Sequence, residues 1–187
     1  LRKYSDAFRV IHGENDGFPG IVLDVYGDCG VLQTYSPVVD NLGRYLSHVV
    51  REKLNLKSVL WKFPAKRKRG EKSDRVLYGK APEAISFKEG KLQLTVDVSS
   101  GQKSGTFLDL RGLRKWTAAQ KLHGKRVLNL FSYSGTLGLA AEIAGAKEIW
   151  NVDISQGALD FSRKYHTIDK DKHRFIAADI FDWLKDL

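Results

Sequence analysis

Hydrophobic and polar positions in the last third of the chain follow the order of a βαβ unit. The apolar run at residues 127–131 predicts a buried strand, and residues 132–135 predict a tight turn after it. Apolar positions then recur at helical spacing over residues 136–144, and Gly145 is placed to end that helix. A second apolar run ends in Asp153. The pattern predicts two parallel strands joined by a helix, with a carboxylate at the carboxyl end of the second strand.

The residues that follow continue this alternation. Residues 155–165 have helical periodicity, and Ser155 is a favourable N-cap residue. Residues 174–177 predict a third strand, and Asp179 precedes a short helix. Because parallel strands are joined by right-handed crossovers, we expect the three strands to lie side by side in the order 3-2-1.

The first half of the chain has the pattern of a small α+β domain. Its predicted elements are strands at residues 21–26, 31–35 and 58–63, a helix at 38–54, a hairpin of 85–87 with 92–98, and a linking helix at 109–122. The predicted organisation is an α+β domain over residues 1–98, a linking segment over 99–125, and an α/β, Rossmann-like domain over 126–187.

The turn at residues 132–135 limits the choice of cofactor for the Rossmann-like domain. A dinucleotide site needs three glycines, because its backbone crowds against a pyrophosphate. Here the turn holds Gly135 alone, and Gly138 lies inside the helix. Such a turn suits a cofactor without phosphate, such as S-adenosylmethionine. The alternative is an ordinary βαβ crossover with no ligand.

Charge points to a polyanionic partner. The chain has 31 basic and 22 acidic residues, a net charge of +9. Such an excess favours phosphate contacts and counterion release. The densest basic run, Lys66, Arg67, Lys68 and Arg69, is flanked by Trp61 and Phe63, a combination that suits single-stranded RNA. The alternative is a solvated loop.

Composition restricts the compartment and the kinds of site. No apolar run has the length of a bilayer span and no signal peptide is recognisable, so we expect a cytoplasmic protein with no membrane partner. The five histidines show no metal-ligand spacing.

The chain starts at Leu1 and holds no methionine, and only three strands follow residue 126, so we expect a truncated Rossmann-like domain. Its open strand edge predicts self-association, as a homodimer.

Two segments resemble a known family. They are Ser-Gly-Gln-Lys-Ser-Gly-Thr-Phe-Leu-Asp-Leu-Arg at residues 100–111 and Val-Leu-Asn-Leu-Phe-Ser-Tyr-Ser-Gly at 127–135. They are similar to the Gly-x-Lys-Thr-Gly-x-Phe-x-Asp-x-Arg and Leu-Asn-x-Phe-Ser-Tyr-Thr-Gly motifs of bacterial large-subunit (23S) ribosomal RNA cytosine-C5 methyltransferases. Ser104 and Ser134 stand where threonine is usual. The resemblance spans the chain from about Phe8 to its end.

The resemblance implies a class I methyltransferase fold, of which this chain holds the first half, with S-adenosylmethionine as cofactor and ribosomal RNA as substrate. It implies that Asp153 accepts hydrogen bonds from both ribose hydroxyls and Asp179 from the adenine amino group, while Ile180 packs on the adenine ring. The residues that it assigns to the cofactor are Lys103, Phe107, Asp109, Arg111, Asn129, Phe131, Ser132, Tyr133, Ser134, Gly135, Asp153, Ile154, Ser155, Asp179 and Ile180.

Some of these residues have an alternative structural role. Asp179 is also a favourable cap for the helix after it, and Asp153 can be a solvated strand end. In the resembling family the segment of Lys103 and Phe107 folds over the cofactor, the basic residues pairing with its carboxylate and Phe107 packing on it. Asp109 and Arg111 can instead cap the linking helix and lie on its surface.

The expected reaction is methylation of cytosine C5, which needs a cysteine thiolate to attack C6. In the resembling family this cysteine lies downstream of the position of Leu187, so we expect the catalytic residues outside this chain. Cys29 falls in a predicted hairpin turn and matches no family nucleophile, so we expect it to be inert. Two alternatives are a guanine-N7 methyltransferase of a sister group and a non-catalytic RNA-binding module.

Overall fold

The computed structural model describes residues 4–64, 75–80, 82–98 and 104–186. The chain forms two compact units, the first from Leu1–Lys88 with Val96–Leu108 and the second from Glu89–Thr95 with Asp109–Leu187. The second hairpin contributes to both units, and the predicted domain limits at residues 98 and 125 stay predictions.

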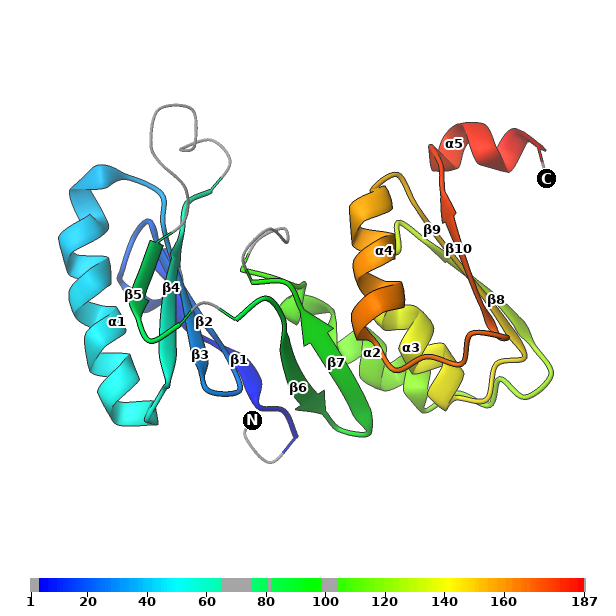
Figure 1. Cartoon of the computed structure of the whole chain (residues 1–187), viewed down its shortest axis with the longest axis horizontal. Helices are drawn as coiled ribbons and strands as arrows, with labels where there is room; N and C mark the ends of the chain where they lie inside the picture. The colour runs from blue at the N-terminus through cyan, green and yellow to red at the C-terminus, as the bar shows by residue number, and fades with distance from the viewer. Residues whose placement is uncertain (1–3, 65–74, 81, 99–103, 187) are drawn as a thin grey trace. The chain divides into compact units, whose positions relative to one another are not determined.

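The first unit is built on a five-stranded sheet in the order β1-β2-β3-β4-β5 (Figure 1). β3 and β4 are parallel, and the other neighbouring strands are antiparallel. α1 (Asp40–Leu54) joins the two parallel strands and packs on both. The strands are β1 (Ala7–His12), β2 (Ile21–Tyr26), β3 (Cys29–Thr34), β4 (Ser58–Lys62) and β5 (Arg75–Tyr78). The sequence pattern predicted α1 and the three central strands but neither outer strand.

α1 lies close to the sheet because one of its residues has no side chain. A Cβ added at Gly43 would stand 2.7 Å from Thr34 Cγ2. The helix ends at Asn55, whose left-handed backbone (φ 53°) forms the C-cap. The buried core of this unit consists of Ile11, Ile21, Leu23, Val25, Leu32, Leu56, Val59, Trp61 and Phe63.

Cys29 is a strand residue, not a turn residue as the sequence predicted. It is the first residue of β3, where it pairs with Tyr26, and it is buried. The turn is shorter than expected because the ladder between β2 and β3 continues almost to Gly27. Burial raises the pKa of the Cys29 thiol to about 11, so the thiol is protonated at neutral pH.

The second unit contains a parallel sheet in the order β10-β9-β8, which confirms the predicted order 3-2-1. Its strands are β8 (Arg126–Leu130), β9 (Glu148–Asp153) and β10 (His173–Ala177). α3 (Thr136–Ile143) and α4 (Gln156–Tyr165) are the crossovers, and both lie on one side of the strands (Figure 1). α5 (Ile180–Trp183) follows β10 and leads into a 3-10 turn at Leu184–Asp186.

The remaining elements precede this sheet in the chain. β6 (Ile85–Glu89) and β7 (Leu92–Val96) form a two-stranded sheet. After a 3-10 turn at Leu108–Leu110, α2 (Arg111–Ala118) is shorter than the predicted helix at 109–122. It ends in a tight turn, in which the Ala119 N–H donates to the Trp116 carbonyl and the Gln120 N–H to the Thr117 carbonyl. The Leu122 N–H beyond this turn donates to the Ala144 carbonyl. None of the helices among the described residues is long and apolar enough to cross a bilayer.

Candidate functional site

The turn between β8 and α3 has an unusual backbone. Phe131 (φ 53°), Tyr133 (φ 48°) and Gly135 (φ 69°) all have left-handed conformations. The first two are bulky residues in a region that favours glycine, at a strain of about 1–3 kcal/mol each. Such strain persists only where the surroundings impose it, and it is concentrated at functional sites. Gly135 begins α3, as predicted.

Asp153 imposes part of this geometry from the end of β9. Its Oδ2 accepts a hydrogen bond from the Tyr133 N–H at 2.7 Å, and its Oδ1 accepts one from the Ser155 N–H at 2.8 Å. Ser155 in turn caps α4, accepting from the Ala158 N–H, as predicted. Each carboxylate oxygen can accept two hydrogen bonds. Asp153 is therefore fixed in orientation, and among the described residues one acceptor position on each oxygen is left without a donor.

Three exposed apolar side chains lie at the carboxyl ends of the three strands. Phe131 is 65% exposed, Ile154 74% and Phe181 70%. The rings of Phe131 and Phe181 are 6.0 Å apart between centroids. Ile180, to which the sequence assigned packing on an adenine ring, is only 4% exposed, because α5 turns its side chain into the unit. Phe181, which the sequence analysis missed, offers the larger surface to a ligand.

Asp179 is the N-cap of α5. Its Oδ1 accepts from the N–H groups of Phe181 at 2.9 Å and Asp182 at 3.3 Å. The alternative role given to this residue, a helix cap, is therefore confirmed. Both bonds use Oδ1, and Oδ2 has no donor among the described residues. A second role as acceptor from a ligand stays a prediction.

A chain of polar side chains crosses the sheet beneath α3. Asn129 donates to Asn151 at 2.9 Å, and Asn151 lies 3.1 Å from His173 Nδ1. His173 Nε2 contacts Glu142 on α3 at 2.9 Å. The Asn129 amide nitrogen thus has a partner inside the unit, and the predicted cofactor role of this residue stays a prediction. Asn151 was missed, although an asparagine within an apolar strand run was a visible signal.

Glycine makes room for this network. A Cβ added at Gly138 would overlap with Asn151 Oδ1 and stand 3.2 Å from Ile149 Cγ2. The predicted helix glycine is therefore needed for α3 to approach β9, not for contact with a ligand.

Two serines of the turn are buried. Ser132 Oγ has no hydrogen-bond partner among the described residues, while the Ser132 N–H donates to the Val152 carbonyl at 3.0 Å. A buried hydroxyl without a partner is uncommon, and ligand sites are one place where it occurs.

Ser134 lies near His166, whose Nε2 contacts the Thr95 carbonyl at 3.0 Å. Burial lowers the pKa of His166 to about 4, so its ring is neutral at pH 7.

Arg111 has a structural partner. Its Nε donates to Glu89 Oε2 at 3.2 Å. The same carboxylate, fully buried, is held by the fully buried Arg114 through bonds of 2.7 and 2.9 Å. Arg111 is thus part of the helix, as its alternative role required, but its partner Glu89 lies in β6 and not on that helix. The sequence pattern pointed to neither Glu89, expected in a hairpin turn, nor Arg114.

The residues of the first family-like segment and of the basic run divide between the two units and the undescribed segments. Ser104 belongs to the first unit, where it bonds the buried Asp24 and lies 2.8 Å from the Tyr26 hydroxyl. Phe107 belongs to the same unit and is half-buried, and Asp109 is exposed at the start of the second. Their roles at the cofactor stay predictions. Residues Lys66, Arg67, Lys68, Arg69 and Lys103 lie outside the described residues.

Comparison with known families agrees with this geometry. Residues 60–185 match the model of a family described as S-adenosylmethionine-dependent methyltransferase. The match covers more than half of the chain, so the chain belongs to the S-adenosylmethionine-dependent methyltransferase family. Membership fixes S-adenosylmethionine as the cofactor of the class.

Individual relatives are similar over nearly the whole chain. A ribosomal RNA large subunit methyltransferase of Deinococcus radiodurans is 34% identical, over 96% of this chain and 46% of that protein. The ribosomal RNA large subunit methyltransferase I of Aeromonas hydrophila is also 34% identical, over 96% and 47%. A solved structure described as a methyltransferase complexed with SAH has a TM-score of 0.84 at 28% identity, over 98% of this chain and 48% of its own. The chain thus spans about half the length of the curated relatives it matches.

The residues at the strand ends fit such a cofactor. The carboxylate of Asp153 keeps two acceptor positions for two neighbouring hydroxyls. The exposed apolar side chains beside it suit a flat ring. A Cβ added at Gly135 would stand 3.0 Å from Ser162 Oγ inside the unit, so its lack of a side chain serves the left-handed turn and its packing, not the close approach of a ligand that the sequence predicted.

Proposed function

We propose that the protein transfers a methyl group from S-adenosylmethionine to large-subunit ribosomal RNA. The observation that carries the proposal is the Asp153 carboxylate, held by the N–H groups of Tyr133 and Ser155 at the tip of β9. The names of the curated relatives support ribosomal RNA as the substrate, and the net charge of +9 supports a nucleic acid. We place this activity in the cytoplasm, where ribosomal RNA is found.

The residues of the chain bind and orient the cofactor in this proposal. When bound, the cofactor supplies a methyl group on a positively charged sulfur. Asp153 accepts from the two ribose hydroxyls, Asp179 Oδ2 accepts from the adenine amino group, and Phe181 with Ile154 covers the ring. The backbone of the turn after β8 lies along the methionine part. We expect Lys103 to pair with the cofactor carboxylate.

We propose 5-methylcytosine as the product, on the strength of the two motifs at residues 100–111 and 127–135. Cys29 is not the thiolate of that reaction, because it is buried and its pKa is raised to about 11. The second candidate, methylation of guanine N7, needs no cysteine nucleophile. Analysis of the product nucleosides separates the two.

The experiment is a tritiated-methyl transfer assay on unmodified large-subunit ribosomal RNA, with the protein at its natural length. We expect transfer by the parent and by Asp160→Ala, an exposed acid on α4, and none by Asp153→Ala. Digestion to nucleosides and mass spectrometry then identify the methylated base. Transfer by Asp153→Ala at the parental rate would remove the basis of the proposal.

A non-catalytic RNA-binding module with a degenerate cofactor fold makes a different prediction. S-adenosylhomocysteine (SAH) at 100 times its dissociation constant stabilises a protein that binds it by about 2.7 kcal/mol. A melting temperature that does not change with added SAH would favour the non-catalytic module.

We also propose that a second copy of the chain is a partner, through the edge strand β8 with its exposed Leu128. Light scattering across a concentration series tests this association.

A further inference from the structure

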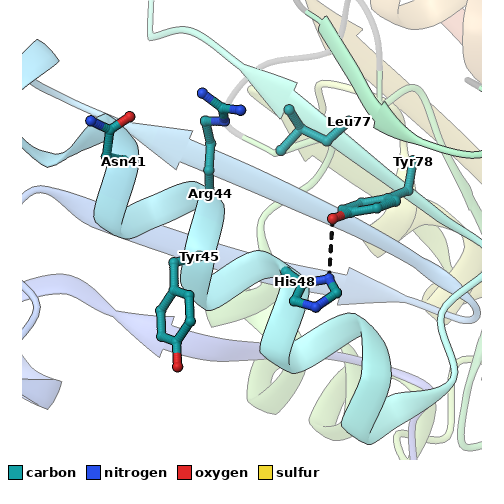
Figure 2. Close-up of a pocket in the computed structure, with 6 residues that line it drawn as sticks. All are labelled: Asn41, Arg44, Tyr45, His48, Leu77 and Tyr78. Carbon is teal, nitrogen blue, oxygen red and sulfur yellow. Dashed lines mark hydrogen bonds between the residues drawn. The ribbon is translucent and has the colours of Figure 1, made fainter.

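The first unit contains a hollow of about 410 Å³ between α1 and β5 (Figure 2). Its lining consists of Asn41, Arg44, Tyr45, His48, Leu77 and Tyr78. The four α1 residues fall at positions i, i+3, i+4 and i+7, so they share one face of the helix. All four are exposed, and the volume is in the range of small-ligand sites. No role described above uses this hollow.

Its aromatic wall is held in a fixed orientation. The Tyr78 hydroxyl lies 3.1 Å from His48 Nδ1, and the two rings are stacked with centroids 5.9 Å apart. The guanidinium carbon of Arg51 lies 4.6 Å from the centre of the Tyr78 ring. Tyr45 adds a second aromatic side chain, 64% exposed. Rigid, accessible aromatic rings are the surfaces on which unpaired bases stack.

The charge of the lining selects among ligands. Arg44 is an exposed cation, His48 and Asn41 offer polar groups, and none of the described residues that line the hollow is a carboxylate. An arginine beside aromatic rings attracts a phosphate next to a stacked base. A neutral apolar ligand would leave Arg44 and Asn41 without a role.

We propose that this hollow binds one unpaired nucleotide of the RNA substrate. Its aromatic side chains contact the base, Arg44 contacts a phosphate, and Asn41 and His48 contribute hydrogen bonds to the base or sugar. A base inside a duplex is paired and stacked, so it cannot enter the hollow. The proposal rests on the proposed function in one respect, that the substrate is RNA.

The test is fluorescence anisotropy of a labelled single-stranded 12-nucleotide RNA, compared with a duplex of the same length. We expect Tyr45→Ala to weaken single-strand binding roughly 5- to 150-fold, since one stacked base contributes ~1–3 kcal/mol. Arg44→Ala should also reduce the slope of log K against log salt by about 1. Lys53→Ala is the matched control, because Lys53 is an exposed cation on the same helix outside the lining. Both test residues are exposed, so we expect unchanged melting temperatures.

Three results would overturn the inference. In the first, Tyr45→Ala and Arg44→Ala bind the single-stranded RNA as tightly as Lys53→Ala does. In the second, the duplex binds as tightly as the single strand and is weakened equally by the variants. In the third, polyglutamate at equal charge displaces the RNA. The last would make the hollow a patch for acidic protein segments. SAH titration and methyl transfer with the same preparations separate the two proposals. Intact methyl transfer with unaffected RNA binding contradicts only the hollow, whereas absent methyl transfer with the expected RNA effect contradicts only the proposed function.

Discussion

The Tyr133 N–H donates to Asp153 Oδ2 at 2.7 Å, which ties the strained turn after β8 to the tip of the neighbouring strand. One carboxylate thus holds the turn and presents its remaining acceptor positions in a fixed direction. Because that orientation is set before any ligand arrives, little conformational freedom has to be lost on binding. The strain in Phe131 and Tyr133 fits a turn shaped for a ligand.

Replacing Asp153 by alanine should weaken SAH binding strongly. Each hydrogen bond to a charged group contributes ~1.5–3 kcal/mol, so two ribose hydroxyls together correspond to a loss of at least 100-fold in affinity. The Tyr133 anchor is lost as well, and we expect a modest fall in melting temperature. Isothermal titration of Asp153→Ala against Asp160→Ala measures the effect. Equal affinities would mean that Asp153 is only a solvated strand end.

Phe181→Ala should weaken SAH binding without destabilising the protein. The side chain is 70% exposed, so its removal leaves no cavity. A flat ring that packs on Phe181 would lose roughly 0.5–1.5 kcal/mol of aromatic contact, about 2- to 12-fold in affinity. Leu184→Ala, at a half-exposed apolar position just after α5, is the control. A titration in which both variants match the parent would place the adenine elsewhere.

Two glycines in helices of the second unit should respond oppositely to alanine. At Gly138 the new Cβ collides with Asn151, and overpacking of this kind typically destabilises by about 1–3 kcal/mol. At Gly157, near the start of α4, nothing lies within 4 Å of the added Cβ, so alanine should stabilise by about 0.4–1 kcal/mol. Urea unfolding of both variants measures the difference. A Gly138→Ala protein as stable as the parent would contradict the close approach of α3 to β9.

Acidification should destabilise the second unit through its buried histidines. Burial lowers the pKa of His166 from 6.5 to about 4 and also lowers that of His173. Between pH 6.5 and 4 the unfolded chain therefore binds protons that the folded chain does not. Stability is full above pH 6.5 and falls with decreasing pH, by roughly 1.4 kcal/mol per unit for His166.

Urea unfolding at pH 7.5, 6 and 5 measures this loss. These values lie above the range in which most carboxylates titrate. His166→Gln cannot titrate, so its stability should fall less between pH 7.5 and pH 5. A parent equally stable at both pH values would show that the buried ring is protonated as easily as in water.

The buried pair of Glu89 and Arg114 should be sensitive to loss of one partner. Arg114→Ala leaves the Glu89 carboxylate buried with Arg111 as its remaining cation among the described residues, and breaking such pairs destabilises by about 3–5 kcal/mol. Arg111→Ala should have a smaller effect, because Arg111 is partly exposed and leaves the Arg114 pair intact. The double variant Glu89→Leu with Arg114→Leu should recover much of the stability. A similar loss of stability in Arg114→Ala and Arg111→Ala would contradict the expectation that Arg114 is the more important partner of Glu89.

The sequence alone determined the features that depend on neighbours along the chain. Apolar periodicity placed the three parallel strands and their crossover helices, because burial of one face imposes a period of 2 or 3.6 residues. Ser155 and Asp179 were recognisable as caps, since a cap acts within three residues of its own position. Asp153 was correctly predicted at the end of a strand and Gly135 at the start of a helix, because the limits of an element are also set by neighbours along the chain.

Only the tertiary structure decided which distant side chains meet. Glu89 looked like a turn residue, and its burial with Arg114, 25 residues later, follows from the packing of α2. Which of Ile180 and Phe181 is exposed depended on which way one turn of α5 faces. The hollow beside α1 exists because β5, which has only four residues and a weak pattern, adds to the sheet next to β4. Contacts of this kind are set by the three-dimensional path of the chain, which local periodicity does not encode.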